Sequence, residues 1–178
     1  LSNRNQDLTL KLDCKTSHIK WLYSGKKKSS WPKVYRKYVL TPTKGTITTG
    51  GQHGLYLLNN GGKNSANSED FILYDNNINV TNGDKTTSGK YSQAVKYHVD
   101  AKNMTIKSTW SYGKTLGKAN FTSVIGYAEQ QSNGNVLIDF GFKAGGQQSN
   151  IIAVTKSGEQ VFTATMKNAA AKAYAYRA

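Results

Sequence analysis

Short runs of alternating apolar and polar residues, separated by glycine, asparagine and serine, extend over most of the chain. A period of two is typical of β-strands that bury one face, and no segment shows a sustained helical period. Threonine, valine, isoleucine and tyrosine fill many of these runs, in agreement with their preference for sheets. The pattern therefore predicts an all-β protein.

The strand pattern repeats itself along the chain. Three segments each contain an alternating apolar strand, a polar turn and a second strand that carries an aromatic residue, which is Trp21, Trp110 or Phe162. These segments are residues 8–25, 94–113 and 150–166. Further strands are expected between them, at residues 54–58, 71–75, 122–127 and 135–140. Four strands per repeat of about 40–50 residues are typical of a β-propeller blade.

We interpret the chain as one β-propeller segment built from four-stranded antiparallel blades, about two and a half of them. Its expected parts are the outer hairpin of an earlier blade (1–25), a connecting loop (26–51), two blades (52–113 and 121–166) and the start of a closing strand (167–178). Such a segment leaves strand edges open, so we expect it to associate with the remaining blades of a larger polypeptide or with another copy of the chain. A β-sandwich or a barrel uses the same alternation and is the alternative architecture.

The chain is strongly basic, with 24 Lys and Arg against 10 Asp and Glu and a formal net charge of +14. A field of this sign attracts anionic partners. The charges are spread along the sequence and cluster only at residues 26–28, whereas nucleic-acid modules usually gather them on one element. We therefore expect no nucleic-acid partner. A non-catalytic basic module that binds anionic cell-wall polymers or glycans is one functional hypothesis.

The cysteine content and the hydropathy of the chain exclude several further classes of protein. Cys14 is the single cysteine, so there is no internal disulfide, and the Cys/His pairs of a zinc site are absent. No run of residues approaches the roughly 20 apolar residues of a membrane helix, so no membrane span is expected. Leu1 begins in the middle of a strand pattern, which indicates that upstream sequence has been removed.

Histidines are the first candidates for chemistry, and the chain has three. His18 and His98 lie inside strand or turn patterns and are interpreted as structural. His53 follows a glycine-rich approach at residues 50–52 and opens the innermost strand of a predicted blade. Because loops that enter innermost strands line one mouth of a propeller's central channel, His53 is the candidate with a functional position.

Motifs in one collinear order cover nearly the whole chain. They are Ser2-Asn3-Arg4, Leu40-Thr41-Pro42, Gln52-His53, Tyr74-Asp75-Asn76, Tyr91-Ser92-Gln93-Ala94-Val95-Lys96-Tyr97, Trp110-Ser111-Tyr112-Gly113, Phe121-Thr122-Ser123-Val124-Ile125 and Asn133-Gly134-Asn135. Together they resemble the bacterial arylsulfate sulfotransferases. The chain departs from the family pattern at Gln93, where the family has arginine, and at Asn77, where it has glycine.

The resemblance implies a six-bladed propeller enzyme that moves a sulfuryl group from a phenolic sulfate ester to a phenol acceptor, with neither a metal nor another cofactor. In the family the histidine of the Gln-His motif attacks sulfur and is transiently sulfurylated, a role that falls on His53. An arginine at a strand end and a threonine before the next blade contact the sulfuryl oxygens; they correspond to Arg4 and Thr122. The family is exported, so a secreted or cell-surface protein is expected, periplasmic in a Gram-negative bacterium.

These residue types suit the chemistry. A neutral imidazole, whose ordinary pKa is about 6.5, is a competent nucleophile near neutral pH. Arginine carries a permanent charge in a fork geometry, and a threonine hydroxyl adds a neutral donor for developing negative charge. The alternative interpretation makes Arg4 a surface residue at a strand end and Thr122 an ordinary strand threonine.

Overall fold

The computed structural model describes residues 1–58, 64–167, 170–172 and 174–176. Its strands are β1 (Ser2–Asn3), β2 (Leu8–Leu12), β3 (Ile19–Ser24), β4 (Thr41–Pro42), β5 (Gln52–Leu57), β6 (Ser68–Asp75), β7 (Gln93–Asp100), β8 (Thr105–Tyr112), β9 (Tyr127–Gln130), β10 (Val136–Lys143), β11 (Gln148–Val154) and β12 (Gln160–Lys167). Short 3-10 helices connect them: η1 (Arg4–Gln6), η2 (Lys28–Ser30), η3 (Lys33–Tyr38), η4 (Lys85–Thr87), η5 (Lys114–Asn120) and η6 (Ala144–Gly146). The predicted all-β class is confirmed.

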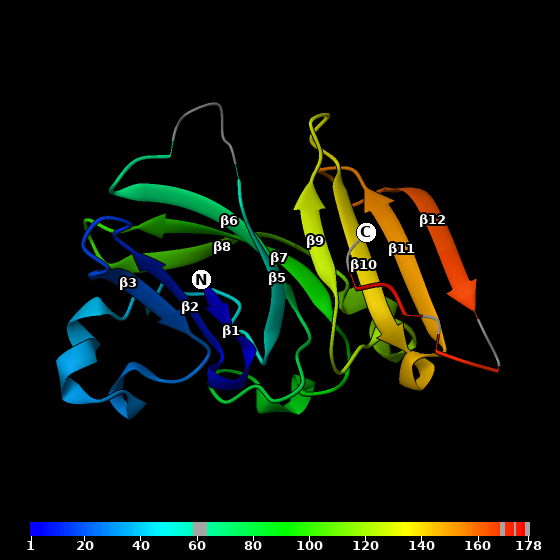
Figure 1. Ribbon diagram of the computed structural model, residues 1–178, viewed down its shortest axis with the longest axis horizontal. Helices are drawn as coiled ribbons and strands as arrows, with labels where there is room; N and C mark the ends of the chain where they lie inside the picture. The colour runs from blue at the N-terminus through cyan, green and yellow to red at the C-terminus, as the bar shows by residue number, and fades with distance from the viewer. Residues whose placement is uncertain (59–63, 168–169, 173, 177–178) are drawn as a thin grey trace.

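The strands form three sheets. In Figure 1 the sheet from β9 to β12 lies at one end of the long axis, and β1-β2-β3 lies together with the sheet that contains β5 to β8 at the other end. The strands from β5 to β8 pair antiparallel in chain order, and so do those from β9 to β12, which makes two four-stranded blades. The predicted blade architecture is therefore confirmed. The first sheet, β1-β2-β3, has three strands because β1 adds to the expected hairpin. Within the expected connecting loop, β4 pairs parallel with β8.

The three repeated segments of the sequence form the hairpins β2–β3, β7–β8 and β11–β12. The strand expected over residues 122–127 is displaced, because β9 begins only at Tyr127. The backbone before it adopts positive φ angles at Ile125 (62°) and Gly126 (129°), which no extended strand can accommodate. Residues 122–126 are therefore a turn that leads into the blade.

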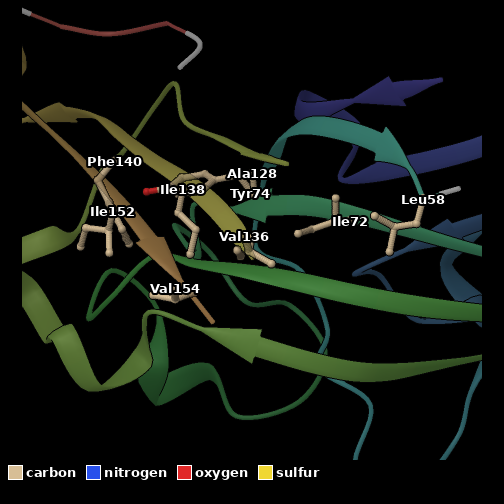
Figure 2. Close-up of a cluster of buried hydrophobic side chains, with 10 residues drawn as sticks. Leu58, Ile72, Tyr74, Ala128, Val136, Ile138, Phe140, Ile152 and Val154 are labelled. Carbon is tan, nitrogen blue, oxygen red and sulfur yellow. The ribbon is translucent and has the colours of Figure 1, made fainter. Parts of the chain in front are cut away.

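Strand β6 lies between two hydrophobic cores. Its alternating side chains Phe71 and Leu73 face the first sheet, where they pack with a cluster that includes Trp21 and Tyr97. Its other face packs against the second blade (Figure 2). The buried residues of that cluster are Leu58, Ile72, Tyr74, Ala94, Ala128, Val136, Ile138, Phe140, Ile152 and Val154. Burial on both faces explains why β6 reads as a continuous apolar run.

The inner strands of the three sheets meet. β5, the inner strand of the first blade, contacts both β1 of the first sheet and β9 of the second blade. The ends of these strands and the turns beside them thus come to one place, although they lie far apart in sequence.

The outer side of the second blade is an open edge. β12 is the last strand of its sheet, and its apolar residues Val161, Phe162 and Met166 are exposed. Association with further blades or with a second copy remains a prediction.

The closing strand expected over 167–178 also remains a prediction. Residues 170–172 and 174–176 are in no strand, and 168–169, 173 and 177–178 lie outside the described residues. In the described part of the chain, no helix has the length and hydropathy of a membrane span.

Candidate active site

His53 is the second residue of β5 and pairs across the ladder with Tyr74 of β6. This register places the imidazole beside Asn76, which directly follows β6, and Nδ1 of His53 lies 2.5 Å from Oδ1 of Asn76. On the other side of the ring, the backbone N–H of Ile125 points to Nε2 at 3.4 Å. The half-buried imidazole is therefore held between the end of one blade strand and the turn that enters the next blade.

Asn76 links the two blades. Its side chain is fully buried, and its amide nitrogen donates to the carbonyl oxygens of Thr122 (3.0 Å) and Ile125 (2.8 Å). The next residue, Asn77, adopts the left-handed conformation at φ 53°. Asparagine tolerates this conformation better than most residues, so the departure from the family's glycine at this position preserves the turn.

Thr122 is buried behind the imidazole. Its hydroxyl lies 2.8 Å from the Tyr74 hydroxyl and accepts a hydrogen bond from the Asn76 amide at 3.2 Å. The Ser92 hydroxyl accepts from the Thr122 N–H and donates to its carbonyl oxygen. The structure thus places Thr122 in the same network as His53, whereas its predicted contact with a sulfuryl group stays a prediction.

Arg4 reaches the same turn from the first sheet. It follows β1, and its Nη2 donates to the carbonyl oxygen of Ser123 at 2.9 Å. In the part of the chain that the structure describes, the buried Nε of Arg4 has no hydrogen-bond partner. Arg4 also lines a cavity of about 260 Å³ together with Asp7 and Lys26. One guanidinium edge therefore holds the turn, while the Nε–H is a buried donor without a partner among the described residues. The lining of this cavity does not include His53.

A second cavity, of about 200 Å³, opens at the imidazole. It is lined by His53, Gly54, Leu55, Ile125, Gly126, Tyr127 and Tyr176. Complete ligand pockets usually measure about 300–1,000 Å³, so this cavity holds a small group or one part of a larger ligand. Its walls come from the two blades and from Tyr176 of the C-terminal segment, and they combine glycine backbone with apolar and tyrosine side chains beside His53.

The electrostatics of the site favour a neutral histidine. Burial lowers the pKa of His53, and the positive charge of Arg4 lowers it further, while the hydrogen bond with Asn76 acts in the opposite direction. Near neutral pH the ring therefore has one nitrogen with a free lone pair, which is the requirement for a nucleophile.

The structure brings all three predicted residues, His53, Arg4 and Thr122, to the turn at 122–125. Two residues of the site were missed. Asn76 stands in a quoted motif, Tyr74-Asp75-Asn76, but nothing in that pattern assigned it a contact. Ile125 also ends a quoted motif, but that pattern did not indicate its contact with His53, because the contact depends on a backbone conformation that isoleucine rarely adopts.

The other two histidines do not belong to this site. Nδ1 of His98 lies 2.6 Å from the Asp70 carboxylate on the paired strands β7 and β6, and His18 precedes β3. Across the described residues, no three His, Cys, Asp or Glu side chains gather in a way that could hold a metal ion.

Comparison with known proteins agrees with this geometry. The model of the family described as Arylsulfotransferase (ASST) matches residues 1–177. The chain is also 35% identical over 52 residues to the arylsulfate sulfotransferase AssT of Escherichia coli O6:H1, a match that covers 29% of this chain and 9% of that protein. The matched stretch is thus a small part of that relative's length. Since the family model spans almost the whole sequence, the chain belongs to the arylsulfotransferase family.

Proposed function

We propose that this chain carries the active-site histidine of an enzyme that transfers a sulfuryl group from a phenolic sulfate ester to a phenol acceptor. The observation that supports it most directly is the position of His53. Its imidazole is half-buried at the wall of a cavity, and burial, together with the charge of Arg4, lowers its pKa. A neutral imidazole in that position can attack a sulfate ester.

The reaction takes place in two balanced steps. In the first, an imidazole nitrogen of His53 forms a bond to sulfur while the bond between sulfur and the phenolic oxygen breaks, and the leaving phenolate takes up a proton from the solvent. In the second, the acceptor phenol loses its proton, its oxygen attacks the sulfur of the sulfohistidine, and the N–S bond breaks. The group is passed between two phenols of similar chemistry, so no further reactant is needed.

Arg4 is the proposed partner of the transferred group. Sulfuryl transfer spreads negative charge over the equatorial oxygens, and a fixed cation lowers the free energy of that state. The unpartnered Nε of Arg4 among the described residues supports this role. The hydroxyl of Thr122 bonds Tyr74 and Asn76, so in this structure Thr122 supports the wall behind His53. A direct bond from Thr122 to sulfuryl oxygen is proposed from the family pattern alone.

Transfer between a chromogenic aryl sulfate and a phenol tests the proposal. His53→Ala is expected to reduce the rate by about 10³-fold or more, since it removes the nucleophile. His98→Ala is the matched control, because this imidazole pairs with Asp70 away from the cavity, and its rate should be unchanged. Mass spectrometry of the donor-treated protein should find an acid-labile sulfuryl adduct on the His53 peptide.

Full activity of the His53→Ala variant, with no adduct on the native protein, would overturn the proposal. Absence of transfer combined with salt-sensitive binding to anionic wall polymers would favour the non-catalytic basic module instead.

We also propose an extracytoplasmic location, from the family resemblance. Cell fractionation that recovers the protein only in the cytoplasm contradicts it.

A further inference from the structure

The orientation of the Asn76 side-chain amide follows from its partners. One end of the amide lies 2.8 Å from the carbonyl oxygen of Ile125 and 3.0 Å from that of Thr122. Carbonyl oxygens only accept hydrogen bonds, so this end must be the NH2 group. The other end, which faces His53, is therefore the carbonyl oxygen Oδ1.

This orientation determines which imidazole nitrogen carries the proton. Oδ1 of Asn76 can only accept, and Nδ1 of His53 lies 2.5 Å from it, so Nδ1 must be the donor. A neutral imidazole has a single N–H, so Nε2 is unprotonated and carries a lone pair. The N–H of Ile125 points to Nε2, and a backbone N–H can do so only if that nitrogen accepts. Both sides of the ring thus indicate the same tautomer.

The turn that supplies the second contact is itself held by Asn76. Ile125 has a positive φ of 62°, a conformation that a β-branched residue adopts only under constraint. The hydrogen bond from the Asn76 amide to the Ile125 carbonyl is part of that constraint. The same side chain therefore binds Nδ1 directly and keeps a donor in place at Nε2.

We propose that Asn76 is a positioning residue that holds His53 as the Nδ1–H tautomer and so makes Nε2 the nucleophilic nitrogen. The consequence for catalysis rests on the proposed function; the tautomer itself does not. In the transfer, the N–H of Ile125 gives up its contact with Nε2, the Nε2 lone pair forms the bond to sulfur, the bond between sulfur and the phenolic oxygen breaks, and the proton stays on Nδ1 with Asn76. Asparagine provides the acceptor without adding a negative charge that would favour the protonated ring.

The test is the 15N NMR spectrum of the substrate-free protein labelled at histidine, at a pH where His53 is neutral. The chain has three histidines, and the His53→Ala spectrum assigns the signals of interest. We expect a protonated Nδ1 and an unprotonated Nε2 in the native protein. In Asn76→Leu the acceptor is lost, and the proton should move to Nε2.

Two further variants separate this role from a structural one. Asn76→Asp loses the same NH2 donors as Asn76→Leu but keeps an acceptor for Nδ1. Because its carboxylate raises the pKa of His53, its spectrum is recorded at a higher pH where the ring is neutral, and there His53 should remain the Nδ1–H tautomer. Tyr74→Phe removes a hydroxyl from the Thr122 network without touching His53, and should also leave the tautomer unchanged. If both Asn76 variants changed the spectrum equally, the residue would be structural only.

A native His53 protonated at Nε2 would overturn the inference, and that result does not depend on any Asn76 variant. An unchanged spectrum in Asn76→Leu would overturn it as well. In the donor-treated protein the sulfuryl group should be bound to Nε2, and an adduct on Nδ1 contradicts the assignment. If no adduct forms while the tautomer is as expected, the proposed function fails and the inference about Asn76 stands.

Discussion

Arg4 and Ser123 lie 119 positions apart in the sequence, and a hydrogen bond of 2.9 Å joins the guanidinium of the first to the carbonyl oxygen of the second. Ser123 belongs to the turn that Asn76 holds from the other side. The candidate site is therefore the point where three sheets meet: Arg4 comes from the first sheet, His53 and Asn76 from the first blade, and the turn from the second.

The pKa of His53 should report the presence of Arg4. A nearby positive charge disfavours the protonated imidazole, so Arg4→Ala is expected to raise the pKa of His53. The acid limb of the pH–rate profile should move to higher pH, and kcat should fall by about 10²–10³-fold because a donor to the transferred group is lost. NMR titration of His53 and steady-state kinetics measure the two effects separately.

The matched control is Arg36→Ala. The Arg36 guanidinium binds the carbonyl oxygens of Ser29 and Trp31 in the loop that contains η2 and η3, away from the imidazole. Neither the titration of His53 nor the rate should change. If Arg4→Ala behaves like this control, Arg4 has no part in the site.

The sequence predicted the blades because their signal is local. Alternation marks the strands, and the aromatic residues Trp21, Trp110 and Phe162 mark the repeated hairpins. The order of the motifs then identified the family. Local patterns also placed His53 at the start of an inner strand, as the structure has it.

The features that the sequence did not predict depend on backbone conformation and on contacts between residues that lie far apart in the chain. Residues 122–127 read as a strand because Val124 and Ile125 favour sheets, yet the contacts of Asn76 hold Ile125 in a left-handed conformation. Asn76 has no distinguishing pattern, since its role requires His53 and Ile125 to lie on either side of it. The pairing of β4 with β8 is likewise a contact between segments far apart in the chain.

The turn at 122–126 should be intolerant of a methyl group at Gly126. A Cβ atom there would lie 2.2 Å from the Tyr74 ring, in a fully buried position. Gly134 also has a positive φ but has open space around it, so Gly134→Ala carries only the backbone strain. We expect Gly126→Ala to lower the free energy of unfolding by about 1–3 kcal/mol more than Gly134→Ala. Equal denaturation midpoints for the two variants contradict the close packing of this turn on Tyr74.

The open edge at β12 should cause self-association. Phe162 is about half exposed on an outer strand with unpaired backbone groups, a combination that favours pairing with another strand. Phe162→Lys is expected to shift sedimentation equilibrium toward the monomer. Gln160→Lys adds the same charge to the same strand without removing an apolar group, so it should have a smaller effect. Identical association in the native protein and both variants would exclude β12 as the contact.

Asp139 gives the protein a specific pH dependence. It is fully buried on β10, and among the described residues neither of its carboxylate oxygens has a hydrogen-bond partner. Burial raises the pKa of this carboxyl to about 7. Between its ordinary pKa and about 7 the folded chain keeps the proton that the unfolded chain releases, so the contribution of Asp139 to stability falls as the pH rises through this interval.

Asp139→Asn removes this ionisation, and its stability relative to the native protein should therefore increase between pH 5 and pH 7, by about 1 kcal/mol for each pH unit, with no further change above pH 7. Urea denaturation at pH 5, 6, 7 and 8 measures the difference. Asp13 provides the opposite case, since hydrogen bonds, first that from the backbone of Thr16, lower the pKa of its partly exposed carboxyl. Asp13→Asn should lose stability relative to the native protein as the pH rises through the acid range. A pH-independent difference for Asp139→Asn would mean that this carboxylate is solvated or paired in the folded protein.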